Sequence, residues 1–233
     1  MALPILYSLQ NCPYAMRARL AILLAQQPVM LRAIDLKNKP AEMLTLSPKG
    51  TVPVLVLENR VGVNNDNEGQ GAFVQRSQVI EESLDIMLWA LTINDPENLL
   101  YSHTPDCLNE MLAIIEENDT QFKPTLEQYK RAKRYHNEDE EQYRQLCEPF
   151  VQQLESRLTQ HAFLMGAKPS LLDYALLPFI RQFSRVNRQL YLQGPYSHLH
   201  AWLNRQLQSR LFSKAMFKYP LWLETRQDYI LGE

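Results

Sequence analysis

The chain has 233 residues, 45% of them hydrophobic, with 24 basic and 26 acidic side chains and a formal net charge of −2. This length suits one large domain or two small ones, and the apolar content excludes an intrinsically disordered chain. The near-neutral charge argues against a surface dedicated to nucleic acid. Apolar runs fall well short of the roughly 20 residues that span a bilayer, and the first residues lack a signal-peptide pattern, so we expect a cytoplasmic protein without a membrane partner.

The first ninety residues alternate strand and helix patterns. Short apolar runs predict four strands, at residues 3–9, 29–36, 53–57 and 79–80. Helical spacing predicts two helices, at residues 13–25 and 83–91. Pro13 suits the first turn of its helix, where the missing N–H costs nothing. The order strand, helix, strand, then strand, strand, helix predicts a small mixed sheet of the thioredoxin type.

One polar stretch separates the third and fourth predicted strands. It covers residues 59–77, and its tip at 64–71 consists of Asn, Asp, Glu, Gln and Gly. Such a tip cannot contribute to a core, so we expect either a long hairpin excursion or a mobile loop.

After about residue 95 the strand patterns stop and only helical spacing remains. Helices are predicted in four segments, at residues 104–122, 137–158, 170–183 and 196–208. Ser170 and Asp173 have the spacing of a capping box at the start of the third. We therefore expect an α/β domain over 1–92, a linker over 93–103 and an all-helical domain over 104–233.

Cys12 lies where the first predicted strand meets the first predicted helix. The unpaired N–H groups and partial positive charge of a helix N-terminus favour a thiolate, which is a nucleophile at neutral pH. A buried structural cysteine is the alternative, because free cysteine is often buried. Ala15 stands where a CxxC motif has its second cysteine, so redox chemistry here must be monothiol. Cys107 and Cys147 fall within predicted helices, and we expect them to be inert.

Two further segments carry polar or backbone groups suited to a ligand. A proline at the start of a core strand is unusual, and a cis Val52–Pro53 bond would turn the Val52 backbone outward to pair with an extended peptide. A plain turn after Gly50 is the alternative. Ser83 is suited to ordinary helix capping. Alternatively, Glu82 and the helix N-terminus together hold the ammonium and carboxylate of an α-amino acid.

Taken together, these motifs resemble the cytosolic glutathione transferase superfamily, most closely its cysteine-type members, the omega-like transferases and the two-domain bacterial glutaredoxin. The matching segments are Cys12 to Ala15 with Arg17 and Arg19, Leu36 to Pro40, Gly50 to Leu55, and Glu82-Ser83 with Ile86. The resemblance implies the glutathione transferase fold, with an α/β thioredoxin-like N-terminal domain and an all-α C-terminal domain that contributes the second-substrate pocket. Two features depart from it: the 59–77 excursion, and Tyr7, which we expect in the core.

The resemblance also implies a role for individual residues. Cys12 would react with, or lie beside, the sulfur of glutathione. The other glutathione-binding residues would be Val52 beside cis-Pro53 for the cysteinyl backbone, Glu82 and Ser83 for the γ-glutamyl head, and Lys39 for the far carboxylate. The second-substrate pocket is expected at Tyr14, Phe122, Phe179 and Trp222.

The function predicted on this basis is a glutathione-dependent thiol transferase or reductase, an oxidoreductase that uses monothiol Cys12 through a glutathione mixed disulfide. Glutathione is expected as a co-substrate, and neither a metal nor a nucleotide is expected. The alternatives are conjugation of glutathione to an electrophile, and a non-catalytic protein with a transferase-like fold. The other partner is a small disulfide or electrophile, and a homodimer stays open.

Basic and histidine residues outside these motifs have simpler interpretations. The basic stretch at 130–134 precedes the acidic stretch at 138–141, which predicts a mixed solvated face. The arginines Arg181, Arg185 and Arg188 lie along one side of a predicted helix and suit either an acidic substrate or, our preferred interpretation, the surface. His198 and His200 are two residues apart on a helix and do not face each other, so a metal site is not predicted there.

Overall fold

The computed structural model describes residues 3–63 and 72–232. The chain divides into two compact units: unit 1 comprises Met1–Asn94 with Lys214–Glu233, and unit 2 comprises Asp95–Ser213. Our expectation for the chain after residue 104 therefore differs from the structure in one respect. The last segment is not part of the helical unit, because it returns to unit 1 and adds a strand to its sheet.

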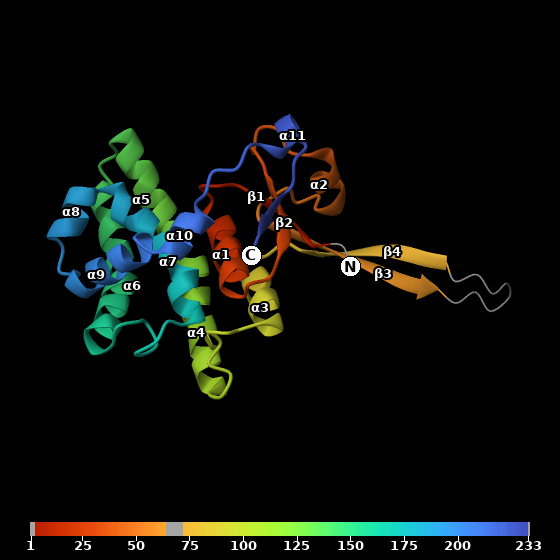
Figure 1. Ribbon diagram of the computed structural model, residues 1–233. Helices are drawn as coiled ribbons and strands as arrows, with labels where there is room; N and C mark the ends of the chain where they lie inside the picture. Colours follow the sequence, from red (N-terminus) through yellow and green to blue (C-terminus); the bar gives the residue numbers. More distant parts are fainter. Residues whose placement is uncertain (1–2, 64–71, 233) are drawn as a thin grey trace. The chain divides into compact units, whose positions relative to one another are not determined.

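Unit 1 is built on a mixed sheet of five strands (Figure 1). They are β1 (Ile5–Ser8), β2 (Val29–Ala33), β3 (Val54–Val63), β4 (Ala72–Ile80) and β5 (Tyr229–Leu231), in the spatial order β4-β3-β1-β2-β5. β1 runs parallel to β2, and the other neighbouring pairs are antiparallel. The mixed sheet predicted from the first ninety residues is confirmed, and β5 is an addition that the sequence pattern did not indicate.

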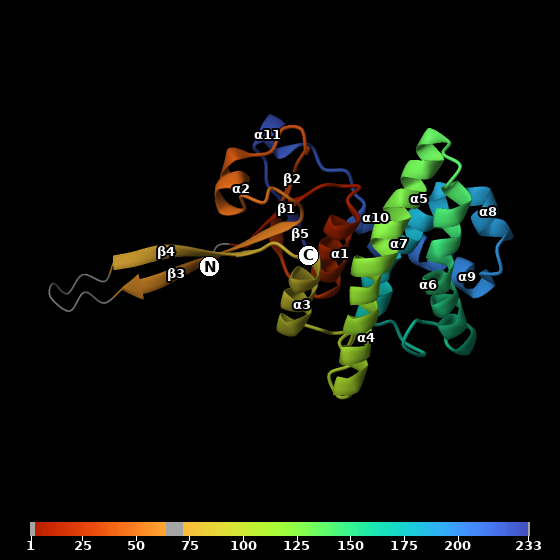
Figure 2. The same cartoon turned by 180° about the vertical axis from the view of Figure 1, so that it is seen from behind.

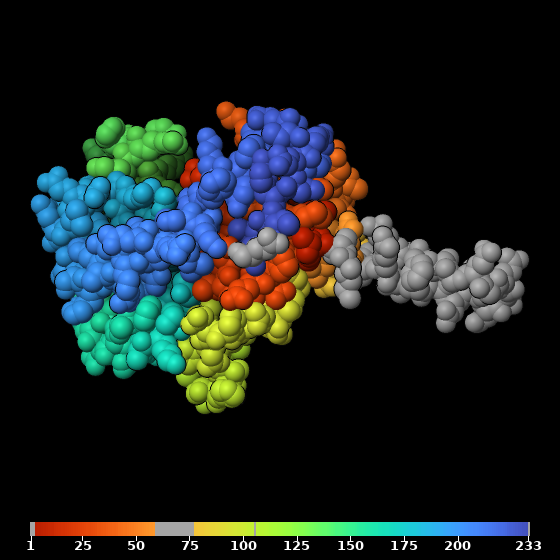
Figure 3. All heavy atoms as spheres, viewed as in Figure 1, coloured from red at the N-terminus to blue at the C-terminus, as the bar shows by residue number. Residues whose placement is uncertain are grey.

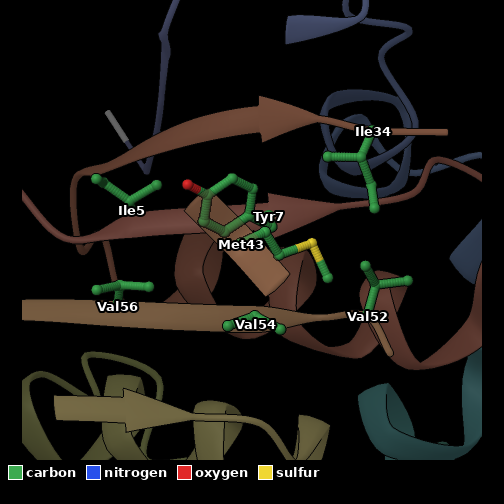
Figure 4. Packing of buried hydrophobic residues seen from close by; sticks show 7 residues of the cluster. All are labelled: Ile5, Tyr7, Ile34, Met43, Val52, Val54 and Val56. Carbon is green, nitrogen blue, oxygen red and sulfur yellow. The ribbon is translucent and has the colours of Figure 1, made fainter. Parts of the chain in front are cut away.

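Helices cover both faces of this sheet (Figure 1). α1 (Pro13–Leu24) and α3 (Ser83–Ile93) pack together on one face, whereas α2 (Ala41–Leu46) and α11 (Trp222–Thr225) lie on the other. Alternate residues of a strand point to opposite faces. Figure 4 shows the apolar cluster on the α2 face, made by Ile5, Tyr7, Ile34, Met43, Val52, Val54 and Val56. Tyr7 is 1% exposed, so its predicted place in the core is confirmed.

β3 and β4 form a long hairpin. Their register runs without interruption from Leu55 opposite Ile80 to Val63 opposite Ala72. β1 pairs only with the first three residues of β3, so the rest of the hairpin extends beyond the sheet as a two-stranded ribbon (Figure 1). Of our two interpretations of 59–77, the described residues show the hairpin, and the polar tip at 64–71 lies outside them.

Unit 2 is helical over its described residues (Figure 2). Its elements are α4 (Pro105–Glu117), the π-helical turn η1 (Asn118–Phe122), α5 (Lys123–Tyr135), α6 (Glu140–Gln160), α7 (Leu171–Val186), α8 (Arg188–Gln193) and α9 (Ser197–Leu207). The next helix, α10 (Arg210–Ala215), begins in unit 2 and ends in unit 1. The predicted capping box of Ser170 and Asp173 is present at the start of α7. In the described part of the chain, every helix is too short or too polar to cross a membrane.

The C-terminal segment is held against unit 1, where Figure 3 shows its dark-blue atoms over those of the N-terminal residues. Two guanidinium groups lie over the ring of Trp222, that of Arg32 at 4.3 Å and that of Arg226 at 4.4 Å from the ring centroid. Gly232 has φ of 99°, and a Cβ there would lie 2.1 Å from the carbonyl oxygen of Gln27. Only glycine fits this close approach, so the end of the chain is specified by both an aromatic stack and a backbone constraint.

Candidate functional site

Cys12 is the N-cap residue of α1, with extended backbone angles, and Pro13 follows at the first helical position. Its carbonyl oxygen accepts the first helical hydrogen bond, from the Met16 N–H at 2.9 Å. Its side chain is half-buried and packs against the apolar cluster of Figure 4. The thiol therefore lies at the positive end of a helix of 12 residues, as the sequence predicted, and is not enclosed in the core.

The loop before β3 faces this thiol. The Val52–Pro53 peptide bond is cis, as the first of our two interpretations requires. The Cys12 thiol lies 3.7 Å from the carbonyl oxygen of Val52, to which it donates a hydrogen bond. Gly50 has φ of 62°, and the ammonium nitrogen of Lys39 lies 3.3 Å from the position that a Cβ on Gly50 would take. Lys39 thus lies beside Gly50, and Val52 lies beside Cys12; we call these residues, with Pro53 and the α3 start, the rim around Cys12.

The start of α3 contributes two polar residues. Glu82, not Ser83 as we expected, is the N-cap residue, and Ser83 is the first residue of the helix and is buried. The Glu82 carboxylate forms an ion pair with Lys49, and this hydrogen bond raises the pKa of Lys49. The hydroxyl of Ser47, two residues before Lys49, donates a hydrogen bond to the carboxylate of the neighbouring Glu81. Ser47 and Lys49 were not predicted, because their role depends on partners more than 30 residues away along the chain.

Arg19 fixes the chain that leads to Cys12. Its side chain is 2% exposed and donates hydrogen bonds to Ser8 Oγ at 2.5 Å and to the carbonyl oxygens of Leu9 at 3.1 Å and Gln10 at 2.6 Å. Its Nε also donates to the carbonyl oxygen of Ala215 at 2.7 Å. Burial lowers the pKa of Arg19 to about 10, and the charges of Cys12 and Tyr219 oppose that shift. One buried cation thereby joins the β1–α1 loop to the C-terminal segment.

A cavity of about 410 Å³ lies in unit 1 beside this loop. Its walls are the β1–α1 loop, the end of β2 and the C-terminal segment, with Leu9, Asn11, Ile34, Phe217 and Leu221 among the lining residues. Asn11 precedes Cys12 directly, Ile34 belongs to the apolar cluster, and Leu9 packs against that cluster as Cys12 does. The cavity falls in the size range of small-molecule sites and is mainly apolar.

The four residues expected in the second-substrate pocket are not brought together in one place. Phe122, 3% exposed, stacks on Phe150 with ring centroids 4.7 Å apart, and Phe179 is fully buried, so both belong to the core of unit 2. Trp222 lies in unit 1 beside two arginines and was wrongly expected in the helical domain. Tyr14 is half-buried in the first turn of α1, next to Cys12 in the structure as in the sequence.

Groups of three or more His, Cys, Asp or Glu side chains placed to hold a metal ion are not found among the residues that the structure describes. The three cysteines are free: Cys12 and Cys107 are half-buried, and Cys147 is buried. The six predicted glutathione-site residues, in contrast, all lie in unit 1, on the α1 start, the two loops that flank α2, and the α3 start. The chemistry that this arrangement offers is that of a single thiol beside backbone and charged groups.

Two family models match the chain in order: the N-terminal domain of glutathione S-transferase over residues 6–98, and its C-terminal domain over residues 138–205. Glutathione S-transferase omega-1 of Mus musculus is 28% identical over 181 residues, which cover 77% of this chain and 67% of the mouse protein.

Solved structures share the fold. Glutathione transferase Omega 2C from Trametes versicolor has a TM-score of 0.72 at 20% identity and covers 94% of both chains. A glutathione transferase family member from Pseudomonas fluorescens pf-5, solved with two glutathione bound, has a TM-score of 0.73 at 15% identity and covers 92% of both. The two domain models together match most of the chain in the order of the family, and the protein belongs to the cytosolic glutathione transferase superfamily as an omega-like glutathione transferase.

Proposed function

We propose that this transferase is a glutathione-dependent thiol transferase or reductase in which Cys12 is the only reacting thiol. The observation that carries the proposal is the position of the Cys12 sulfur at the N-terminus of α1, 3.7 Å from the Val52 carbonyl oxygen. A thiolate is the attacking species in thiol–disulfide exchange, and reactive cysteines are commonly found at helix N-termini. Because Ala15 replaces the second cysteine of a CxxC motif, the partner sulfur must come from glutathione.

The cycle has two exchange steps. The Cys12 thiolate attacks the glutathione sulfur of a mixed disulfide, the substrate S–S bond breaks, and the substrate leaves as a thiolate that takes up a proton. Cys12 is then joined to glutathione. The thiolate of a second glutathione attacks that glutathione sulfur, Cys12 leaves as a thiolate, and oxidised glutathione departs. Overall, the substrate sulfur is reduced to a thiol, one reduced glutathione is consumed, and its sulfur joins the glutathione of the mixed disulfide as oxidised glutathione.

The rim around Cys12 supplies groups that match glutathione. We assign the Val52 backbone, next to cis-Pro53, to the cysteinyl segment, and Lys39 to the far carboxylate. Glu82 takes the α-ammonium, and Ser83 with the α3 N-terminus takes the α-carboxylate. The side chains of Glu82 and Lys49 are 64% and 50% exposed, so their ion pair is weak and a ligand ammonium can replace it.

The second substrate is assigned to the cavity of unit 1 rather than to Phe122 and Phe179. Those two rings are buried in a core, whereas the cavity opens next to Asn11 and is lined by apolar residues of the C-terminal segment. Its size and lining suit a compact apolar or aromatic group attached to the sulfur that Cys12 attacks. Since each turnover consumes reduced glutathione, we place the activity in a reducing compartment, the cytoplasm.

The test is an intact-mass measurement after incubation with oxidised glutathione. We expect one glutathione adduct, removed by a dithiol reductant, on the wild-type protein and on Cys107→Ser. We expect none on Cys12→Ser. The half-buried Cys107 lies in the first turn of α4, so Cys107→Ser is the matched control for a thiol near a helix start. An unmodified wild-type protein, or an adduct that persists in Cys12→Ser, would overturn the proposal.

A further inference from the structure

The cavity of unit 1 has two walls that come from opposite ends of the chain. One is the β1–α1 loop, which leads to Cys12, and the other is the C-terminal segment at residues 217–221. The first four residues of the second wall belong to no helix or strand and follow the end of α10 at Ala215 closely. The last one, Leu221, forms an isolated parallel bridge with Ala33. The position of this wall therefore depends on what holds the segment at each end of a short irregular span.

Side chains of the β1–α1 loop and of α1 hold the near end of the span. Arg19 Nε donates a hydrogen bond to the carbonyl oxygen of Ala215 at 2.7 Å, and Arg19 Nη2 lies 3.9 Å from the sulfur of Met216. The amide of Gln10 donates a second hydrogen bond, to the carbonyl oxygen of Met216 at 3.0 Å. Two adjacent residues of the C-terminal segment are thus tied to the loop and the helix that carry Cys12.

Arg19 binds both walls with one rigid group. Besides its bond to Ala215, the buried guanidinium donates to the carbonyl oxygens of Leu9 and Gln10 in the loop. In the part of the chain that the structure describes, its acceptors are all uncharged. Burial lowers the pKa of Arg19 only to about 10, so the group stays charged at neutral pH. A planar fork of donors can serve several fixed acceptors at once, which the single ammonium group of a lysine cannot do.

The span between these ties and Leu221 carries two aromatic side chains of the cavity. Phe217 and Tyr219 are both lining residues, and their ring centroids lie 4.9 Å apart. Phe217 is 59% exposed, so little packing of its own fixes the ring. It directly follows Met216, whose carbonyl oxygen accepts the hydrogen bond from Gln10. A shift of the tied backbone would therefore move the aromatic wall.

We propose that Arg19, assisted by Gln10, is a positioning residue that holds the aromatic wall of Phe217 and Tyr219 at a fixed distance from Cys12. The wall then selects substrates in which the sulfur under attack carries a planar aromatic group, because aromatic rings pack favourably against one another. Arg19 acts through the backbone of the C-terminal segment and not on the reacting sulfurs. The inference about the substrate rests on the proposed thiol transfer, whereas the position of the wall can be tested without it.

The first test measures the wall in the full-length protein without substrate, by hydrogen exchange and mass spectrometry. Gln10→Ala removes one tie, and we expect peptides that cover residues 216–221 to exchange at least about fivefold faster. The matched control is Asn94→Ala, since that amide donates to the carbonyl oxygen of Ala25 at 2.9 Å and neither residue lines the cavity. The control should leave these peptides within about twofold of the wild type. Unchanged exchange in Gln10→Ala would overturn the inference, whatever the activity.

The second test compares two substrates, the mixed disulfides of glutathione with benzyl mercaptan and with 2-mercaptoethanol. Selectivity is the ratio of their kcat/KM values, so a loss common to both substrates leaves it unchanged. We expect selectivity for the aromatic substrate to fall at least about tenfold in Arg19→Lys and about threefold in Gln10→Ala, through a higher KM. Asn94→Ala should retain it.

The outcomes separate this inference from the proposed function. Unchanged selectivity in both variants would contradict the role of the wall, even if their rates fall. A wild-type protein that reduces neither substrate would overturn the proposed thiol transfer, and hydrogen exchange would still decide whether the two ties hold the wall. If Arg19→Lys fails to fold, as its melting curve would show, Gln10→Ala alone decides both tests.

Discussion

Cys12 and Cys147 carry the same thiol in opposite surroundings. Cys12 is half-buried at the start of α1 and faces a backbone carbonyl oxygen. Cys147 lies within α6 with no exposed surface, and burial, followed by the charge of Glu148, raises its pKa to about 12. Burial favours the neutral thiol of Cys147, whereas the Cys12 sulfur is only half-buried at a helix start. Position within the helix and burial, rather than residue type, therefore decide which cysteine is a candidate nucleophile.

Acidic residues of the two units show the same contrast. Glu82 of unit 1 has one exposed lysine partner that a ligand can replace. Asp173 of unit 2 is fully buried and accepts four hydrogen bonds, two from Ser170 and one each from Leu164 and Trp202. Unit 1 thus has an exposed, weakly held carboxylate at the start of α3, while unit 2 uses its buried carboxylate to hold the helical core together.

The largest expected effect concerns the reactive thiol. Cys12→Ser should lower the rate of glutathione-dependent reduction of a small mixed disulfide by at least about a thousandfold, because the covalent nucleophile is lost. A coupled assay of glutathione oxidation measures this rate. In contrast, Cys147→Ala should retain the wild-type rate within about threefold. Conjugation of glutathione to an electrophile that survives or increases in Cys12→Ser would assign the protein to the alternative reaction.

The next effect concerns Asp173. Asp173→Asn replaces one acceptor oxygen by an NH₂ group that faces donors, so we expect a loss of about 3 kcal/mol in the free energy of unfolding. Urea unfolding followed by circular dichroism measures it. The matched control is Asp106→Asn, an exposed aspartate in the first turn of α4, which should change stability by less than about 0.5 kcal/mol. Similar values for the two variants would show that the buried hydrogen bonds contribute little.

The third prediction uses the raised pKa of Cys147, about 12 in the folded chain against 9.0 for the unperturbed thiol. A raised folded pKa gives stability that is present below the unfolded pKa and is lost as pH rises toward the folded value. Between pH 9 and about 10.5, the wild type should therefore lose about 2 kcal/mol more stability than Cys147→Ala. Urea unfolding at both pH values checks this difference. Parallel curves would mean that the thiol is not protected by burial.

The smallest effect concerns the exposed ion pair at the α3 start. Lys49→Gln should change the free energy of unfolding by less than about 0.5 kcal/mol, because exposed ion pairs are weak. Glutathione binding, measured by calorimetry, should weaken about tenfold in Glu82→Gln and by less than about twofold in Lys49→Gln. If both substitutions weaken binding equally, Lys49 itself contacts the ligand and our assignment of the ammonium site to Glu82 is wrong.

Much of the site could be predicted because its signals are local. Cys12 and Pro13 mark a helix start within two residues, and Gly50 to Pro53 form one short segment that enters a strand. Ser170 and Asp173 form a capping box within a single turn. Such patterns depend on neighbouring backbone groups, so they are visible without the fold.

Other features depend on residues far apart in the chain and had no local signal. Arg19 is fixed by Ala215 and by the β1–α1 loop, and β5 pairs with β2 across about 200 residues. The hydrophobic pattern of residues 229–231 is too short to predict a strand. The place of Trp222 in unit 1 depends on the contact of its ring with Arg32, which is far away along the chain. We consequently misplaced the last segment with its Trp222, and we expected Phe122 and Phe179, which are buried, to line a pocket.

The sequence by itself determined the family resemblance, the mixed sheet followed by helices, and the position of the single thiol at a helix start, because these depend on local spacing and backbone chemistry. Only the tertiary structure decided which charges and apolar side chains meet. It pairs Lys49 with Glu82, closes the cavity beside Asn11 with the C-terminal segment, and ties that segment to the β1–α1 loop through Arg19. These contacts join residues far apart in the chain, and packing alone fixes them.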